Sequence, residues 1–240
     1  MNWALPDIAP ALSASTPARI LAGRAGTRPT TAQLLRFQVD HACARDAVRT
    51  VVDHEFPSRM DCVLEVHSAA RDKHEYLLDP GAGRKLRSGE DERLRAHLPA
   101  APQVLVAIGD GLSSAAVEAQ VPLLLPALLD CLGACGFDSI AGPVYVHMAR
   151  VGILDALGDV LRPEVGILLV GERPGLATAL SLSAYLGFQP RQGRTDADRN
   201  VLSNIHAAGV PALEAAAIVA GWARSMLRQG KSGVGFRPES

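Results

Sequence analysis

An acid and a base stand next to each other where a short apolar segment of the sequence ends. The segment 165–175 is Val-Gly-Ile-Leu-Leu-Val-Gly-Glu-Arg-Pro-Gly, so Glu172 and Arg173 follow the apolar run directly. Its length and its β-branched residues favour a buried strand, and Pro174 cannot donate to a sheet ladder. Ligands bind at the carboxyl ends of strands in open α/β sheets. The sequence therefore predicts a ligand site at Glu172 and Arg173, and these two residues alone leave the kind of ligand open.

A second candidate site is the turn at 109–114, Gly-Asp-Gly-Leu-Ser-Ser, between a predicted strand and a predicted helix. A dinucleotide-binding loop occupies such a position, but Ser114 stands where its third glycine belongs. The acid expected about 20 residues later would be Asp130, which lies late in a helical segment and not at a strand end. Nucleotide binding is therefore the less favoured interpretation, although the backbone N–H groups of this turn are well placed to face a ligand.

The densest polar cluster of the chain lies at 193–206 and holds Arg, Asp, Asn, Ser and His side chains. Composition alone favours a solvated, irregular loop. Val201, Leu202 and Ile205 interrupt the polar residues, however, and an apolar side chain can fix such a loop against the core. We therefore expect a polar loop, close to the Glu172 site, that is able to hold a polar ligand.

The histidines and cysteines do not form a metal-binding pattern. No H-E-x-x-H motif is present, and the only close cysteine pair is Cys131 and Cys135, whereas structural zinc needs four ligands. No metal site is predicted, and the cysteines are expected to be free thiols in a reduced cytosol. His41 lies on the apolar side of a predicted helix and is expected to be a core residue, while His147 ends a predicted strand.

The elements that carry these residues fall into two regions. Residues 1–16 are expected to form a flexible leader, and residues 17–99 a smaller, mainly helical N-terminal region. Thr30 or Thr31 is a suitable N-cap for an amphipathic helix of about 20 residues, whose apolar positions recur at spacings of three and four. The segment 60–68 predicts a short strand or extended arm, and the prolines at 99–102 mark the boundary.

The second region, residues 100–240, alternates apolar runs with helical segments. Strands are expected near 104–108, 144–147 and 166–170, with helices at 114–132 and 211–227, a helix or loop at 151–161, and a frayed tail from Gly230. Pro122 and Pro126 are expected to break or kink the first of these helices. The alternation predicts an α/β fold, a Rossmann-like, mainly parallel sheet with flanking helices.

Composition excludes several classes of function. Apolar residues make up 48% of the chain, charged residues 20%, and the formal net charge is −1. A protein that binds nucleic acid through bulk electrostatics would carry an excess of basic residues. We therefore do not expect this protein to bind nucleic acid. The sequence contains no apolar run of about 18 residues, so no membrane span is predicted. The first residues do not resemble a secretory signal. We expect a cytoplasmic protein.

Taken together, several segments resemble the small (light) subunit of ethanolamine ammonia-lyase, an adenosylcobalamin-dependent enzyme. They occur in the order found in that family and span about residues 17 to 228. The matching segments are Arg-Ala-Gly-Thr-Arg-Pro at 24–29, Leu-Arg-Phe-Gln-Val-Asp-His-Ala at 35–42, Arg-Asp-Ala-Val at 45–48, Asp-Gly-Leu-Ser at 110–113, Gly-Glu-Arg-Pro-Gly-Leu at 171–176, Ser-Leu-Ser-Ala-Tyr at 181–185, and Asp-Arg through Ser-Asn-Ile-His at 198–206.

The resemblance implies an activity and a partner. The family converts ethanolamine to acetaldehyde and ammonia by a radical rearrangement that starts from adenosylcobalamin. The resemblance implies that a separate large subunit supplies the substrate pocket and the catalytic side chains, so no catalytic residue is expected on this chain. Six large and six small subunits form the family's complex. The implied location is the cytoplasm, with packaging in a bacterial microcompartment left open.

The resemblance also implies three cobalamin contacts on this chain. Val151 matches a valine that touches the cofactor, and Glu172 matches the glutamate of the strand-end loop. Val201 stands where the family has a cysteine, so a contact there would depend on backbone or shape instead of sulfur. A carboxylate suits the amides on the corrin rim, and Val151 suits its hydrocarbon edge.

Two other functions stay open at this point. The chain could be a stand-alone Rossmann-like module that binds a nucleotide at the turn 109–114. It could also be a non-enzymatic scaffold whose loops bind only a partner protein. Thermal stabilisation by nucleotides would favour the first of these, and an activity assay would exclude the second.

Overall fold

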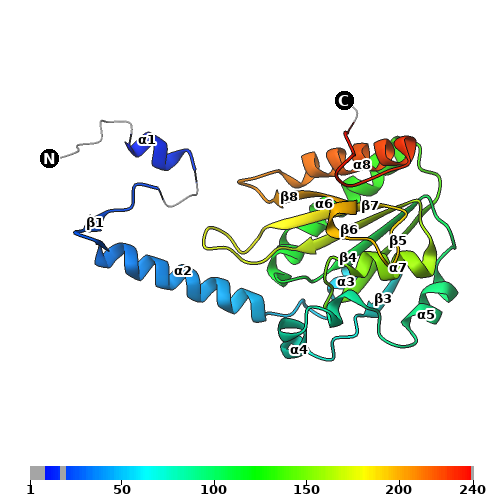
Figure 1. Cartoon of the computed structure of the whole chain (residues 1–240), viewed down its shortest axis with the longest axis horizontal. Helices are drawn as coiled ribbons and strands as arrows, with labels where there is room; N and C mark the ends of the chain where they lie inside the picture. The colour runs from blue at the N-terminus through cyan, green and yellow to red at the C-terminus, as the bar shows by residue number, and fades with distance from the viewer. Residues whose placement is uncertain (1–8, 17–19, 239–240) are drawn as a thin grey trace.

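The structure is a computed structural model that describes residues 9–16 and 20–238. It consists of a body built around a six-stranded sheet and an N-terminal arm that extends from it (Figure 1). The leader expected over residues 1–16 lies partly outside the described residues. Within it, Ala9–Ala14 form the short helix α1.

The sheet has the strand order β3-β5-β4-β6-β7-β8. The first four strands in this order are parallel to one another, while β7 is antiparallel to both β6 and β8. The mainly parallel α/β fold is therefore confirmed. The strands are β3 (Leu64–His67), β4 (Val104–Gly109), β5 (Ile140–His147), β6 (Val165–Gly171), β7 (Leu182–Phe188) and β8 (Arg199–Ile205).

The central strands are buried on both faces, as their apolar runs require. Every residue of β4 and of β6 is buried. Strand β3 lies within the segment expected to be mainly helical, yet it forms one edge of this sheet and pairs with β5. The domain boundary near residue 100 remains a prediction.

Helices cover both faces of the sheet, so that the body has three layers. On one face α6 (Ser114–Ala134) and α8 (Ala212–Gln229) pack on β4, β6 and β7. On the other face α5 (Glu90–His97) and α7 (Ile153–Leu161) pack on β4, β5 and β6. The remaining short helices are α3 (Phe56–Arg59), α4 (Lys73–Leu78), η1 (Ala82–Arg84) and η2 (Asp196–Asp198).

Helix α6 is continuous, so the expected break at its two prolines is wrong, while the alternative of a kink stays a prediction. Pro122 and Pro126 lie on the exposed side of the helix, where the carbonyl groups that they leave unpaired can reach water. Buried Val121, Leu124 and Leu128 hold the opposite side against the core. By length and composition α6 would also suit a membrane span, but here it is a core helix packed on the sheet and α8.

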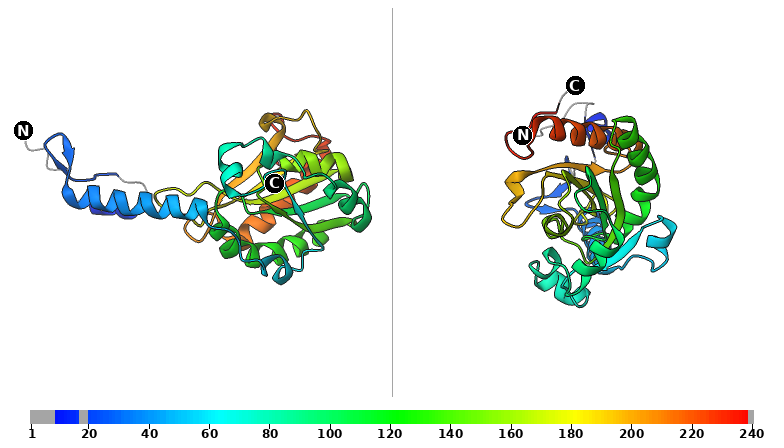
Figure 2. Two further views of the ribbon diagram at one scale, coloured as in Figure 1. Left: turned by 90° about the horizontal axis from the view of Figure 1, so that it is seen from below. Right: turned by 90° about the vertical axis from the view of Figure 1, so that its right-hand side faces the viewer.

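The arm consists of α1, the two-stranded pairing of β1 (Arg24–Ala25) with β2 (Arg28–Pro29), and the long helix α2 (Thr31–Arg49). The Thr30 hydroxyl accepts from the Gln33 N–H at 3.4 Å, which confirms the expected N-cap. The left view of Figure 2 shows α2 leading away from the body. None of its residues is buried, and His41 is exposed, so the expectation of a core histidine is wrong.

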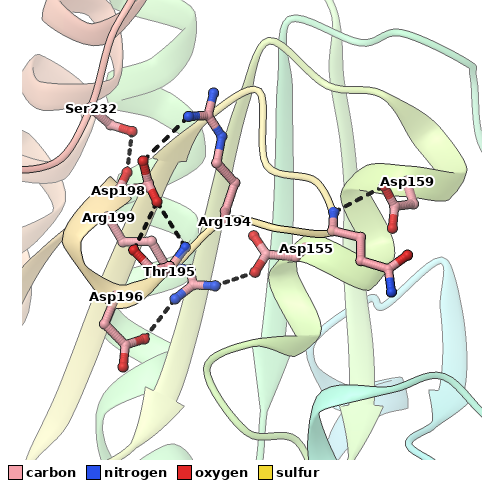
Figure 3. A network of polar contacts seen from close by, with 9 residues as sticks. Asp155, Asp159, Arg194, Thr195, Asp196, Asp198, Arg199 and Ser232 are labelled. Carbon is pink, nitrogen blue, oxygen red and sulfur yellow. Dashed lines mark hydrogen bonds and ion pairs between the residues drawn. The ribbon is translucent and has the colours of Figure 1, made fainter.

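Residues 199–205 form the edge strand β8, which corrects the irregular loop expected over 193–206. A polar network fastens the start of this strand (Figure 3). Arg199 pairs with Asp155 of α7 and, at 2.7 Å, with Asp196. The Ser232 hydroxyl donates to the Asp198 carbonyl at 2.5 Å. Sequence analysis missed the strand because an edge strand paired on one side tolerates polar residues.

Candidate functional site

The candidate site lies beside β4, at the point where the chain stops adding strands on one side of this strand and begins to add them on the other. From β4 the chain passes through α6 to β5 on one side, and then through α7 to β6 on the other side of β4. The carboxyl ends of these strands diverge at such a switch point, which leaves a crevice that ligands occupy in open α/β sheets.

A cavity of about 460 Å³ opens in this crevice. It is lined by the turn that follows β4, by the loop after β5, by the end of β6 and by residues of β7 and β8. Val151, Glu172 and Val201, the three residues singled out from the sequence, all line this cavity. The fold therefore brings together positions that are far apart in the chain, and their role as cofactor contacts stays a prediction.

Glu172 supports the fold with one carboxylate oxygen. Its Oε1 accepts from the Ser183 hydroxyl at 2.6 Å and from the Asn204 N–H at 2.8 Å. An irregularity in the pairing of β7 and β8 leaves one extra residue in β8 near Asn204, so Glu172 satisfies an N–H that the ladder does not use. No described residue donates to the other oxygen, Oε2, which leaves it available as an acceptor for a ligand.

Val151 owes its position to a buried acid at the end of β4. The Asp110 carboxylate is fully buried and accepts from the N–H groups of Met148 at 2.9 Å and Ala149 at 3.0 Å. Burial raises the pKa of Asp110 above its usual value, and the two N–H donors oppose that effect. Asp110 thus joins the ends of β4 and β5 and fixes the loop that presents Val151.

Arg150 and Tyr76 complete this side of the cavity. The Tyr76 hydroxyl donates to the Ala149 carbonyl at 3.0 Å, and the Arg150 guanidinium lies 4.2 Å from the centre of the Tyr76 ring. Arg150 also donates to the Tyr76 carbonyl at 2.9 Å, while its buried Nε has no partner among the described residues. The arginine is therefore held in place with donor capacity that its own chain does not use.

The opposite wall is formed by neighbouring residues of the antiparallel strands. Tyr185 and Val201 face each other across β7 and β8, and both line the cavity with Ser203. Val201 offers hydrocarbon surface to the cavity. Burial raises the pKa of Tyr185, and the nearby negative charge of Glu172 adds to this, which keeps the phenol neutral.

Sequence analysis missed Arg150, Ser183, Tyr185 and Ser203 as lining residues. A usable signal was the alternation within two strands, because residues two apart point to the same face. Ser183 and Tyr185 follow this spacing on β7, as do Val201 and Ser203 on β8. The signal requires that β8 be identified as a strand, which its polar composition concealed.

The turn at Gly109–Ser114 is packed against β6. The Leu112 N–H donates to the Gly171 carbonyl at 3.1 Å, so this N–H does not face a ligand. Gly111 has a φ of +61°, and a Cβ there would lie 2.3 Å from the Gly171 carbonyl oxygen. The glycine is therefore required for close approach of two backbones, so its presence does not by itself indicate a nucleotide site at this turn.

Two comparisons with known proteins show what this chain is similar to. The family model described as "Ethanolamine ammonia-lyase light chain (EutC)" matches residues 6–237. A protein of Clostridioides difficile (strain 630), described as "Ethanolamine ammonia-lyase small subunit", is 43% identical over 226 residues. That alignment covers 94% of this chain and 76% of the relative.

Proposed function

The chain belongs to the ethanolamine ammonia-lyase light chain family, and from this we propose that it completes the adenosylcobalamin site of a large-subunit partner. In that role it contributes to the conversion of ethanolamine to acetaldehyde and ammonia. The observation that carries the proposal is the meeting of Val151, Glu172 and Val201 at one cavity above the sheet.

The chemistry of the cavity fits the edge of a corrin. The corrin rim carries amide side chains, which need both acceptors and donors. The free oxygen of Glu172 is a charged acceptor, while Arg150, Arg173 and Ser203 are donors. Val151 and Val201 provide apolar surface for the hydrocarbon of the ring. The residues present therefore suit the group.

The size of the cavity fits a shared site. A whole cobalamin is larger than about 460 Å³, so this chain would cover one part of the cofactor and the partner the rest. Adenosylcobalamin, when bound, supplies the radical chemistry, and the protein orients it and excludes water. Glu172, fixed by Ser183 and Asn204, would set the orientation through one rim amide.

The arm provides independent support for a partner subunit. Leu34 is 44% exposed and Phe37 43%, and their spacing of three residues places them on one side of a helix without buried residues. Apolar side chains grouped in this way mark protein interaction surfaces. The name of the relative, a small subunit, points to a large subunit as the protein that covers them.

The first experiment mixes the purified chain with a large subunit and adenosylcobalamin and follows the release of acetaldehyde. We expect activity only when both subunits are present. Full activity of the large subunit alone would contradict the proposal, and stabilisation by nucleotides without any effect of cobalamin would favour the alternative of a stand-alone nucleotide-binding module.

The second experiment separates the two roles of Glu172. Glu172→Ala should raise the cobalamin concentration needed for half-maximal acetaldehyde release about tenfold, the loss expected for one charge-assisted hydrogen bond. Glu172→Gln keeps an oxygen for Ser183 and Asn204 but replaces the charged acceptor, so it should raise that concentration with less effect on stability. The control Glu214→Ala changes an exposed acid of α8. An unchanged cofactor requirement in both Glu172 variants would remove this residue from the site.

A further inference from the structure

A second cavity, of about 510 Å³, adjoins the first one. It lies between the C-terminal half of α2 and the loops that follow β5 and β6. Leu112, Arg150 and Arg173 line both cavities, so the two share a wall. Helix α2 and these loops thus enclose a second space, to which the proposed function assigns no ligand.

This second cavity is strongly basic. It is lined by Arg45 and Arg49 of α2, by Arg150 and by Arg173, with His41 beside them. None of the described residues that line it is an acid. Several guanidinium groups without a matching carboxylate repel one another, and an anion with several oxygens relieves that repulsion.

The internal partners of these arginines are few. Within the described part of the chain, Arg49 and Arg173 form no ion pair or side-chain hydrogen bond. Arg45 is 4.0 Å from Asp46 in a solvent-exposed pair, which contributes little. The buried Nε of Arg150 has no partner among the described residues. Most of the donors around the cavity are therefore free for a ligand.

The dipole of helix α2 explains the position of only one of the arginines that line the second cavity. Arg49 lies in the last turn of α2, where a cation offsets the helix dipole. Arg150 and Arg173 come from two other segments, after β5 and after β6, and line the same cavity as Arg49. The dipole of α2 does not explain that convergence.

We propose that this cavity binds a phosphate group, and that the phosphate is the phosphodiester of the cobalamin nucleotide tail. The inference rests on the proposed function, because the shared wall joins the cavity to the corrin site. The phosphodiester is the negatively charged group of cobalamin, and guanidinium groups bind phosphate oxygens in pairs. Free inorganic phosphate has the same chemistry and is the other source that the test must distinguish.

The test compares two corrinoids that differ in this group. Cobinamide lacks the nucleotide tail and its phosphate, whereas cobinamide phosphate carries the phosphate without the base. Equilibrium dialysis against the complex of both subunits, followed by corrin absorbance, gives the affinity for each. We expect the unaltered complex to prefer cobinamide phosphate.

Arg49→Gln should weaken the binding of cobinamide phosphate about tenfold and leave the binding of cobinamide unchanged, and Arg45→Gln, which also lines only the second cavity, should act in the same direction. Both arginines are exposed and make no internal contact that folding needs. Arg224→Gln removes the same charge from an exposed position of α8 and should change neither affinity. If Arg49→Gln lowers the affinity for both corrinoids equally, or lowers neither affinity, the proposal is overturned.

Titration of the free chain with inorganic phosphate separates the two sources. Loss of phosphate binding in Arg49→Gln, with both corrinoids bound equally by the unaltered complex, would support the anion site and assign it to free phosphate. If the unaltered complex binds neither corrinoid, the proposed function fails. In that case the phosphate titration still decides the anion site, because a chain that binds no phosphate contradicts it.

Discussion

Helix α2 and strand β4 were both expected from the spacing of apolar residues, but they differ in what covers them. All six residues of β4 are buried, whereas the 19-residue helix α2 has no buried residue at all. Its larger apolar residues Leu34, Leu35, Phe37 and Val39 are exposed. Apolar periodicity thus indicates that a surface will be covered, and it does not indicate whether the cover belongs to the same chain.

This contrast divides the protein by the source of its stability. The body buries an aliphatic core within its own chain, so substitutions there should lower the free energy of unfolding. The arm buries little, so substitutions there should leave unfolding unchanged and weaken binding to the partner. The substitutions that follow test this division, beginning with the largest expected effect.

Asp110→Ala should have the largest effect. It leaves the buried N–H groups of Met148 and Ala149 without an acceptor, which should lower the free energy of unfolding by about 3 kcal/mol. Urea unfolding followed by circular dichroism measures it. Asp46→Ala, an exposed acid on α2, is the control and should change stability by less than about 0.5 kcal/mol. Equal losses in the two variants would contradict the division.

The combined substitution of Leu34→Ser and Phe37→Ser, two exposed apolar residues on one side of α2, should have the next largest effect. It should weaken binding to the large subunit by about 2 kcal/mol, since grouped apolar anchors dominate interfaces, and leave urea unfolding of the free chain unchanged. Val234→Ser changes an apolar residue that is 79% exposed but lies outside the arm. Calorimetry with the large subunit should detect weaker binding only for the arm variant, and loss of stability in the free chain would show that the arm packs on the body.

Ser183→Ala should have a smaller effect within the body. It removes the 2.6 Å hydrogen bond to Glu172 and should lower the free energy of unfolding by about 1 kcal/mol. Ser203→Ala, in the adjacent strand, removes an exposed hydroxyl that has no partner among the described residues, and it serves as the control. If both variants unfold alike, the contact between Ser183 and Glu172 contributes nothing to stability.

The smallest effect concerns pH. His67 stacks on His147 with 4.5 Å between ring centres, and burial, followed by the nearby His147 charge, lowers the pKa of His67 below 6.5. The folded state therefore favours the neutral ring, so His67 should contribute full stability above pH 6.5 and lose it as the pH falls below that value.

Urea unfolding at pH 7.5 and pH 5.5 tests this point. The unaltered chain should lose more stability between these two values than His67→Gln, since glutamine does not titrate. His74→Gln, at an exposed position of α4, is the control. The same loss in all three proteins would show that His67 does not contribute to the pH dependence.

The sequence was sufficient to predict the central layer of the fold. Strands β4, β5 and β6 are apolar runs between turn residues, and burial on both faces gives them a pattern that few other structures share. Glu172 was identified for the same reason, because a charged residue directly after such a strand must lie at the edge of the sheet.

The remaining errors arise where burial depends on neighbours distant in the chain. Strand β8 is polar because it pairs on one side alone, with β7. Helix α6 stays continuous because its prolines happen to face water. The basic cavity requires Arg49, Arg150 and Arg173 from three segments, and no spacing along the sequence relates them.

The segment after α8 was expected to be frayed, yet Phe236 is buried at 3% exposure. The Val234 N–H donates to the Ala197 carbonyl at 3.0 Å, and the Gly233 N–H donates to the Asn200 side chain at 2.6 Å. These contacts cover the first residues of the edge strand β8, which would otherwise be a template for pairing between chains.

The order of synthesis gives this contact a consequence for the cell. The residues that protect β8 follow this strand in the chain, so the edge stays open until they too have left the ribosome. A nascent or prematurely ended chain that stops near Gly230 would present β8 unprotected to its neighbours on a polysome, and would be prone to self-association.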